Sequence, residues 1–239
     1  MVDDASHSPP TNQDHGGESP EVDALRTLYR AGGFLMADER TGEIRAFEHD
    51  PRAIVPLSRD EGLHVARSLR QRVRSARFTI TTDACFDRVI DACAKRRAEG
   101  TWISPRLARL YTALHREGPR RCVHAHSIEA WLQTAQGPTL VGGLYGVAVG
   151  AVFCGESMFS RPDLGGTDAS KVCLVHLIHH LRARGFRVLD AQIWNPHLAT
   201  FGVKRLPRAA FRRALAAHRD TDLPWTPFDP HRARVEPTP

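Results

Sequence analysis

The sequence predicts a mixed α/β fold of the α+β kind, in which helices flank a central sheet. Two observations favour it. Apolar residues recur at helical spacing in some segments and fill short strand-like runs in others, and the order is strand, two helices, several antiparallel strands, helix, strand, helix. With 239 residues, 41% of them hydrophobic, the chain can form one large domain or a main domain with a small satellite.

Composition divides the chain into four parts. Residues 1–20 are rich in Ser, Pro, Gly, Asn and Asp, which predicts a disordered tail. Residues 21–60 are expected to form a small N-terminal domain, and residues 61–222 the main domain. Residues 223–239 contain five prolines and are expected to form an irregular tail.

The first part contains a short set of elements. Val22, Leu25, Leu28 and Tyr29 have helical spacing, and Gly32–Gly33 is a stop signal for that helix. A short apolar strand over 53–56 and an arginine-rich helix over 61–74 are expected to follow.

The later part is richer in boundary signals, namely caps at Asp83, Ser104 and Asp168 and glycine stops. The elements that these signals and the apolar patterns predict are strand 78–81, helix 83–100, helix 104–118, strand 126–132, strands 140–149 and 151–160 turning near Gly150, helix 168–185, strand 186–194, a short helix 195–202 and a last helix from Pro207.

Charge is unevenly distributed. The net charge is +6, and removing the four acids of residues 1–20, which hold no Lys or Arg, leaves +10 on the rest of the chain. A basic body favours a polyanionic partner, above all nucleic acid, although an arginine-rich proteome would give the same composition.

A dense run of arginines lies in one predicted helix and just after it. Five guanidinium groups this close repel one another unless an anion neutralises them, and phosphate suits their geometry. A solvated helix face is the alternative interpretation. The run consists of Arg67, Arg70, Arg72, Arg74 and Arg77.

Two predicted strands carry carboxylates in otherwise apolar surroundings. Glu156 lies within strand 151–160, and Asp190 and Gln192 lie within strand 186–194. Alternation places Asp190 and Gln192 on one face, where a carboxylate and an amide could orient an amine nucleophile. The alternatives are that Asp190 pairs with an arginine or accepts backbone amides, and that Glu156 lies at a frayed sheet edge.

Other sequence features argue against several classes of protein. His176, His179 and His180 could chelate a metal by spacing, but no acid or Cys completes the set, so we expect them to be exposed to solvent and we expect no metal site. The five cysteines are odd in number and lack C-x-x-C spacing, which indicates reduced thiols. No apolar run is long enough for a membrane span, and residues 1–20 do not resemble a secretory signal.

Known nucleotide-binding and hydrolase motifs are also missing. We find no Walker loop, G-x-G-x-x-G, nucleophile elbow or H-E-x-x-H, which disfavours nucleotide-hydrolysing and dinucleotide enzymes. The late strand and helix, with Asn195, Ala199 and Phe201–Gly202, resemble the corresponding segment of GNAT acyltransferases, in which neighbouring strands splay and acyl chemistry occurs in the gap. The main domain is therefore expected to hold a GNAT-like mixed sheet flanked by helices.

Read together, several segments resemble the leucyl/phenylalanyl-tRNA–protein transferase family, the bacterial aminoacyltransferases of the N-end rule. They occur in family order between about residues 25 and 215, and Phe-Cys-Gly-Glu-Ser-Met-Phe-Ser is the most specific. The matching stretches are Asp50-Pro51-Arg52-Ala53, Glu99-Gly100-Thr101-Trp102-Ile103, His124-Ala125-His126-Ser127-Ile128-Glu129, Val141-Gly142-Gly143-Leu144-Tyr145-Gly146-Val147, Phe153 to Ser160, Ala169-Ser170-Lys171 and Leu189-Asp190-x-Gln192.

The resemblance implies a cytoplasmic enzyme that transfers Leu, Phe or Met from aminoacyl-tRNA to the N-terminal amine of proteins beginning with Arg or Lys. It implies no cofactor, metal or membrane. Asp190 and Gln192 match the pair thought to bind the acceptor amine, and Glu156 matches the acid of the site. Trp102 would stack near the terminal adenosine of the tRNA, and the arginine run would bind the acceptor stem through its backbone. The remaining substrate-binding positions are Phe153, Leu144, Met158 and Leu174, which would line the pocket for the transferred side chain, and Ser157.

Departures from the family pattern leave alternatives open. Met36 and Glu48 stand at aromatic positions of the family's first domain, so a diverged relative with another donor or acceptor, or a tRNA-binding protein with weakened catalysis, remains an alternative. An acetyl-CoA-dependent GNAT enzyme is disfavoured, because 165–168 places an acid where a pyrophosphate would need backbone amides.

Overall fold

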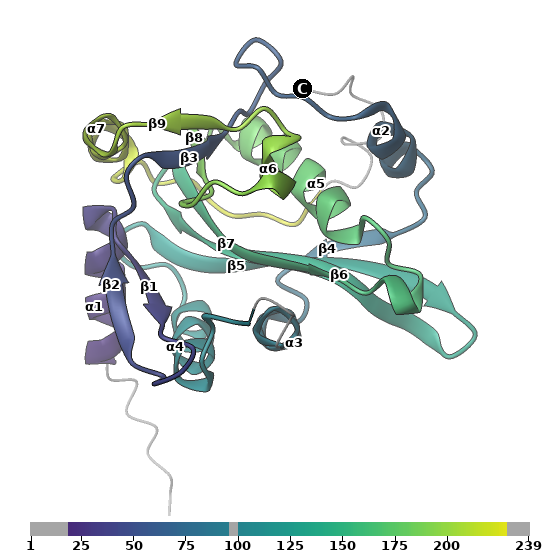
Figure 1. Cartoon of the computed structure of the whole chain (residues 1–239), viewed down its shortest axis with the longest axis horizontal. Helices are drawn as coiled ribbons and strands as arrows, with labels where there is room; N and C mark the ends of the chain where they lie inside the picture. The colour runs from purple at the N-terminus through teal and green to yellow at the C-terminus, as the bar shows by residue number, and fades with distance from the viewer. Residues whose placement is uncertain (1–18, 96–99, 229–239) are drawn as a thin grey trace, which may run out of the picture.

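The structure is a computed structural model that describes residues 19–95 and 100–228 (Figure 1). The disorder expected for residues 1–20 falls almost wholly outside this range, as does the last part of the 223–239 tail. The elements are α1 (Pro20–Ala31), β1 (Phe34–Ala37), β2 (Ile44–Phe47), β3 (Arg52–Val55), α2 (Arg67–Arg74), β4 (Thr79–Thr82), α3 (Phe86–Ala94), α4 (Pro105–Arg116), β5 (Val123–Thr134), β6 (Gly137–Val149), β7 (Val152–Ser160), the 3₁₀ turn η1 (Pro162–Leu164), α5 (Ala169–Arg184), β8 (Val188–Asp190), α6 (Pro196–Ala199), β9 (Lys204–Leu206) and α7 (Arg208–His218).

A seven-stranded sheet forms the centre of the molecule, in the order β4-β5-β6-β7-β8-β3-β9. The β7–β8 pair is parallel and the other pairs are antiparallel, so the predicted mixed α/β class is confirmed. β1 and β2 form a separate hairpin. β3 comes from the first sixty residues but lies between β8 and β9, which places residues 52–55 in the same sheet as the late strands.

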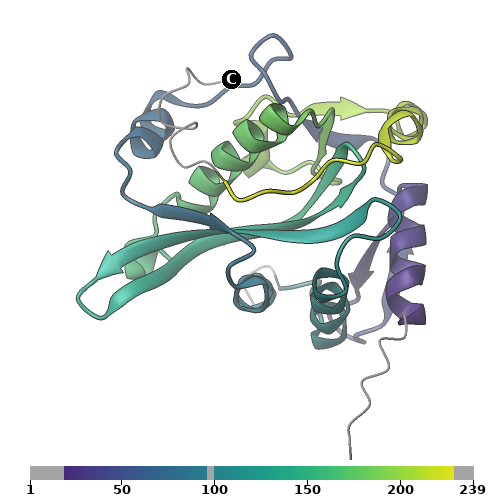
Figure 2. The ribbon, with the colours of Figure 1, turned by 180° about the vertical axis from the view of Figure 1, so that it is seen from behind.

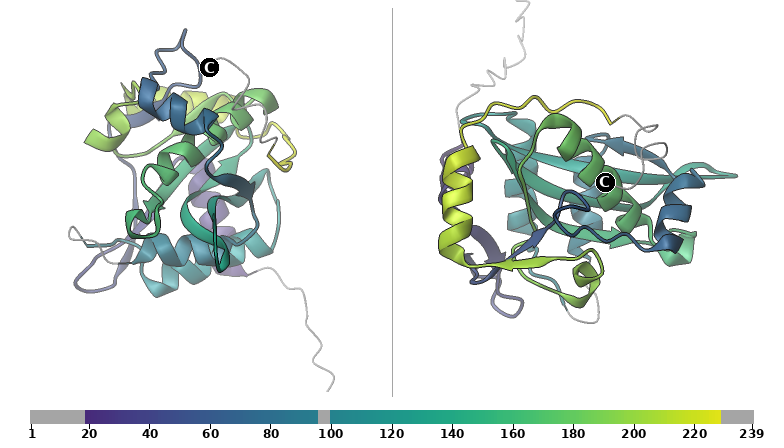
Figure 3. Two further views of the ribbon diagram at one scale, coloured as in Figure 1. Left: turned by 90° about the vertical axis from the view of Figure 1, so that its right-hand side faces the viewer. Right: turned by 90° about the horizontal axis from the view of Figure 1, so that it is seen from above.

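Helices cover both faces of the sheet (Figures 1 and 3). On one face, α2 and α5 pack with the apolar side chains of β5, β6 and β7 in one core. On the other face, α1, α3, α4 and α7 enclose a second core. Amphipathic stripes explain this arrangement for the surface helices, because each buries the stripe that it turns toward the sheet, whereas α5 is buried on all sides over most of its length.

β7 is the strand where the regular pattern breaks. Opposite it, Tyr145 pairs with Ser157 and Gly146 pairs with Gly155, so Glu156 is an extra, unpaired residue in a β-bulge. The bulge reverses the alternation that the sequence pattern implied, and Phe153 and Met158 therefore pack on the same core. The parallel pairing of β7 with β8 stops at Cys154 and Asp190.

Several predicted elements are shorter than expected, among them the helices expected over 83–100 and 195–202, which are α3 and α6. The helix expected over 61–74 begins only at Arg67. Before it, Leu63 and Val65 are buried at a two-residue period and the N–H of His64 donates to the carbonyl of Phe201, which is extended rather than helical backbone. The strand expected over 186–194 is β8 alone, because the chain turns immediately after Asp190.

Asp83 does not cap a helix as predicted. Its carboxylate instead accepts hydrogen bonds from the backbone N–H of Ser127 (2.9 Å) and from the ring of His126 (2.8 Å). The expected caps at Ser104 and Gly185 are confirmed: the Ser104 side chain accepts from the N–H of Leu107 and Gly185 closes α5 in the left-handed conformation.

The exposure predicted for the three histidines of α5 is wrong. His176, His179 and His180 are all buried, because a second layer covers their side of the helix. After α7, the chain runs alongside α5 over the sheet (Figure 2). There Trp225 packs against His180 with ring centroids 4.6 Å apart and stacks on His126 at 3.9 Å. The start of the predicted irregular tail therefore has no regular structure but is part of the core.

Candidate active site

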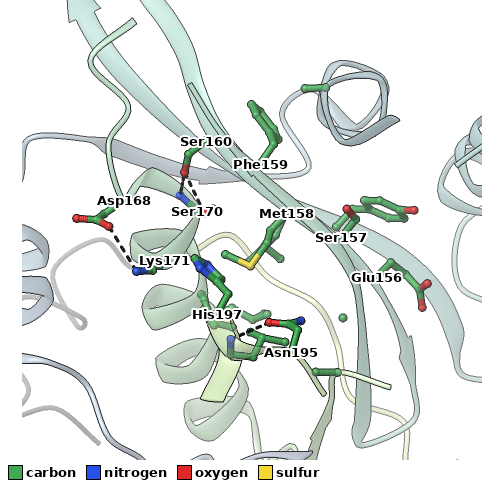
Figure 4. Close-up of a pocket in the computed structure, with 18 of the residues that line it drawn as sticks. Glu156, Ser157, Met158, Phe159, Ser160, Asp168, Ser170, Lys171, Asn195 and His197 are labelled. Carbon is green, nitrogen blue, oxygen red and sulfur yellow. Dashed lines mark hydrogen bonds and ion pairs between the residues drawn. The ribbon is translucent and has the colours of Figure 1, made fainter. Parts of the chain in front are cut away.

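A cavity of about 1150 Å³ opens where β7 and β8 separate. Apolar walls line its middle and polar groups lie at two ends, which Figure 4 shows well apart. We call the end at Glu156 the acid end and the end at Asp168 and Lys171 the arginine end, because Arg72 of α2 pairs with Asp168 there (3.3 Å).

Glu156 lies at the acid end because of the β-bulge that leaves it unpaired in the sheet. Its Oε1 accepts hydrogen bonds from the hydroxyl of Tyr29 and from Nε2 of Gln192, both at 2.5 Å, and its Oε2 is 3.5 Å from the hydroxyl of Tyr111. Burial raises the pKa of Glu156 to about 7, while the hydrogen bonds from Tyr29 and Gln192 oppose that rise. The acid can therefore exchange a proton near neutral pH.

Tyr29 and Tyr111 hold this acid from α1 and α4. Burial and the neighbouring Glu156 raise the pKa of both phenols well above the ordinary value of 10, so both remain protonated. Their hydroxyls are 2.7 Å apart, which joins them into one hydrogen-bonded unit with the carboxylate. Neither role follows from the sequence pattern, because Tyr29 is part of a helix stripe and Tyr111 lies within the helix predicted over 104–118.

Asp190 is fully buried and pairs with the equally buried Arg52 of β3. The guanidinium binds both carboxylate oxygens, with Nε 3.2 Å from Oδ1, and it also donates to the carbonyl of Gly32 at 3.0 Å. It lies 4.4 Å from the ring centroid of Phe211 and 5.1 Å from that of Phe34. The arginine-paired alternative for Asp190 is therefore what the structure shows, and Arg52 is a site residue that the sequence analysis did not identify as one.

Gln192 reaches the site through a tight turn rather than through strand alternation. Ala191, Gln192 and Ile193 form a γ-turn, in which the N–H of Ile193 donates to the carbonyl of Ala191 (2.6 Å) and Gln192 has a φ of +59°. The N–H of Gln192 donates to Oδ1 of Asp190 (2.9 Å). Such a backbone costs about 1–3 kcal/mol and persists only where its surroundings fix it. Asp190 thus fixes the turn that aims the Gln192 amide at Glu156.

The structure places most of the predicted substrate-binding residues on the cavity wall. These are Leu144, Met158, Leu174, Trp102 and Ser157. Phe153 is the exception: it is fully buried outside the lining, where its ring packs on Trp225 with centroids 5.6 Å apart. Figure 4 shows Met158 between the two ends, beside Asn195 and His197.

The five predicted phosphate-binding arginines lie on and just after α2 and differ in their contacts. Arg70 donates to the carbonyl of Val65 (2.8 Å), Arg72 pairs with Asp168, and Arg77 donates to the carbonyl of Gly165 (3.0 Å). Arg67 and Arg74 are exposed and make no ion pair with any residue in the described ranges. The helix is thus docked beside the arginine end of the cavity, with two guanidinium groups open to solvent.

Across residues 19–95 and 100–228, no three His, Cys, Asp or Glu side chains are grouped so that they could hold a metal ion. Over the same ranges, no helix has the length and apolar character that a membrane span requires.

Comparison with known proteins decides the family. The model of the leucyl/phenylalanyl-tRNA protein transferase family matches residues 57–216. The chain belongs to this family. A leucyl/phenylalanyl-tRNA–protein transferase of Salinibacter ruber is 45% identical over 206 residues, which cover 86% of this chain and 83% of the relative.

Further family members agree over similar lengths. The transferase of Synechococcus sp. strain JA-3-3Ab is 47% identical over 182 residues, covering 76% of this chain and 86% of its own. The transferase of Shewanella denitrificans is 44% identical over 220 residues, which cover 92% of this chain and 87% of the relative. As a member of this family the chain is an aminoacyltransferase, and the resemblance on which the sequence analysis relied is confirmed.

Proposed function

We propose that this protein transfers leucine, phenylalanine or methionine from aminoacyl-tRNA to the N-terminal amine of proteins beginning with Arg or Lys. One observation supports the proposal beyond family membership: a single cavity extends from an acid able to bind an amine to Asp168 and Lys171, where Arg72 of the arginine-rich α2 docks. The two substrates of such a reaction are a cationic amine and a nucleic acid, and the two ends of the cavity suit one each.

The donor side chain is proposed to lie between the two ends. Leu144, Met158 and Leu174 line this part of the cavity, and an unbranched, polarizable Met adapts to side chains of different shape. Phe153 supports this wall from behind. Trp102, which is partly buried on the cavity wall, would stack on the terminal adenosine. An apolar pocket of this kind discriminates by size and shape rather than by hydrogen bonding.

The acceptor amine is proposed to bind at the acid end. Glu156 accepts the hydrogen bonds of an ammonium, and no residue in the described part of the chain donates to the amide oxygen of Gln192, which leaves that oxygen free for the amine. One proton of the ammonium first passes to Glu156. The neutral amine nitrogen then attacks the ester carbonyl carbon, the new C–N bond forms, and the C–O bond to the ribose breaks. The second proton lost by the nitrogen ends on the ribose oxygen.

Proton transfer suits the pKa of Glu156. An α-amine has an ordinary pKa near ~8, and an acid whose pKa is about 7 can hold the proton in transit without trapping the amine as ammonium. The ester is already activated, so the step balances without ATP or a metal. Asp190 is proposed to be a positioning residue, because its carboxylate is fully engaged by Arg52 and Gln192.

The arginines on and after α2 are proposed to hold the acceptor stem by its phosphates, with Arg67 and Arg74 free to do so. Backbone contacts carry no sequence information, which suits an enzyme that accepts several tRNAs. Since charged tRNA is a cytoplasmic substrate, the protein is proposed to act in the cytoplasm.

A direct assay tests the proposal. The protein is incubated with Leu-, Phe- or Met-tRNA and with peptides that begin with Arg, Lys or Asp, and the products are weighed by mass spectrometry. One added residue on the Arg and Lys peptides is expected, with none on the Asp peptide. Extension of the Asp peptide alone would indicate a diverged acceptor specificity, and tRNA binding with no product on any peptide would refute the transferase assignment.

A further inference from the structure

Two consecutive apolar side chains are exposed immediately after the γ-turn. Among the described residues, only four large hydrophobic side chains are more than 36% exposed, and Ile193 (38%) and Trp194 (37%) are two of them. Single exposed apolar residues are ordinary, but adjacent ones beside a cavity indicate a contact surface. Both residues follow Gln192 in the chain, and the Gln192 side chain binds Glu156.

The backbone anchors this pair on both sides. The carbonyl of Gln192 accepts the N–H of Ala53 (3.1 Å), and Asn195 caps α6 by accepting the N–H of Leu198 (2.9 Å). Asn195 and Leu198 themselves line the cavity. Trp194 is thus fixed between Gln192, which reaches the acid end, and Asn195, which lines the cavity.

Positive charge borders the same surface. The guanidinium of Arg205, on β9 at the edge of the sheet, lies 5.0 Å from the ring centroid of Trp194. Arg205 is exposed and makes no ion pair with any carboxylate in the described part of the chain. An aromatic face next to such a cation matches a ligand that presents an apolar group followed by an acid.

We propose that Ile193, Trp194 and Arg205 form a subsite for the second to fourth residues of the acceptor polypeptide. The inference rests on the proposed function and adds a preference to it: an aromatic or large apolar second residue, followed by an acid. Two residues of extended chain span about 7 Å, and Trp194 follows two residues after Gln192, whose amide binds Glu156. The tRNA is assigned to the opposite end, where α2 docks.

Four acceptor peptides test the subsite. They begin Arg-Phe-Glu, Arg-Phe-Gln, Arg-Gly-Glu and Arg-Gly-Gln and are otherwise identical. With the intact protein, transfer from Leu-tRNA is expected to have the lowest peptide KM for Arg-Phe-Glu. Trp194→Ala is expected to raise that KM about tenfold and to remove the preference for Phe over Gly, while the KM for Leu-tRNA stays unchanged.

Charge variants separate the two parts of the subsite. Arg205→Gln is expected to remove the preference for Glu over Gln but to keep the preference for Phe. Arg213, an exposed arginine of α7 with no ion pair among the described residues, provides the matched control: Arg213→Gln is expected to change neither preference. Trp194→Phe is expected to restore most of the discrimination that Trp194→Ala loses.

Binding of a labelled peptide, followed by fluorescence anisotropy, distinguishes failure of the subsite from failure of the function. If the intact protein transfers to all four peptides with equal KM, the subsite is refuted and the function stands. If it transfers to none but binds Arg-Phe-Glu in a Trp194-dependent way, the subsite stands and the function is refuted. If Trp194→Ala raises the KM for Leu-tRNA alone, the surface serves the nucleic acid and the inference is wrong.

Discussion

Removal of the Asp190 charge is expected to lower both the free energy of unfolding and the rate of transfer. In Asp190→Asn, the guanidinium of Arg52 keeps its bond to the carbonyl of Gly32 and its two aromatic neighbours but loses a carboxylate that engages it through two nitrogens. A buried charge left without its partner costs about 3–5 kcal/mol. Arg52→Met strands the opposite charge and is expected to cost a similar amount.

A double-mutant cycle measures this pair. The free energy of unfolding in urea is determined for both single variants and for the double variant at one pH. The double variant is expected to be less destabilised than the two singles added together, by at least about 2 kcal/mol, because it leaves no unpaired charge. If the losses add within about 0.5 kcal/mol, the pair is not energetically coupled and the structural argument fails.

Transfer rates of the same variants test the positioning role. Both single variants release the turn that carries Gln192, so they are expected to lower kcat to a similar extent under conditions where they remain folded. A direct role of Asp190 on the amine predicts otherwise: Asp190→Asn would then lose at least about 100-fold more activity than Arg52→Met. That result would refute the positioning role.

Three further predictions follow from charges described above. Because the pKa of Glu156 is raised from 4.5 to about 7, the folded state keeps that proton to higher pH than the unfolded chain does. The free energy of unfolding of the intact protein, measured in urea and compared with that of Glu156→Gln, should therefore fall between about pH 4.5 and 7, by up to about 3 kcal/mol. Burial lowers the pKa of His180 from 6.5 to about 4. The free energy of unfolding of the intact protein, compared with that of His180→Leu, should therefore be constant above pH 6.5 and fall as the pH drops toward 4, again by up to about 3 kcal/mol. Arg67→Gln combined with Arg74→Gln should weaken tRNA binding and lower the slope of log K against log salt by about 1–2, without a change in stability, whereas the exposed Arg109→Gln should leave the slope unchanged.

Each of these has a contradicting outcome. Parallel stability curves for the intact protein and Glu156→Gln from pH 4.5 to 8 would show that the acid is not buried as described. An unchanged difference between His180→Leu and the intact protein from pH 7 to 4 would show that water reaches that ring. An unaltered salt slope in the Arg67 and Arg74 variant would place the nucleic acid elsewhere.

Local sequence patterns predicted several boundaries of helices and strands correctly. Ser104, Gly150 and Gly185 mark boundaries that the structure confirms, because their conformations are set by neighbours in sequence. The histidine face of α5 was misjudged, since Trp225, which buries it, lies more than forty residues later. Burial on that face depends on a distant segment that no helical period reveals.

The sequence predicted which polar residues form the site but not how the backbone brings them together. Glu156, Asp190 and Gln192 stood out as polar residues in apolar segments, and the structure brings them together. Strand alternation could not foresee how, because a bulge at Glu156 and a γ-turn at Gln192 both interrupt the two-residue period. Arg52, their essential partner, comes from 138 residues before Asp190, a pairing that only the sheet order reveals.

The position of β3 has a consequence for how the protein is made. Its partners in the sheet, 188–190 and 204–206, are synthesised well after residues 52–55. Until Asp190 has emerged, β3 has neither partner strand and Arg52 lacks the carboxylate that it pairs with, and β9 joins the sheet later still. A nascent copy therefore lacks an assembled site while the ribosome that makes it draws on the same charged tRNAs.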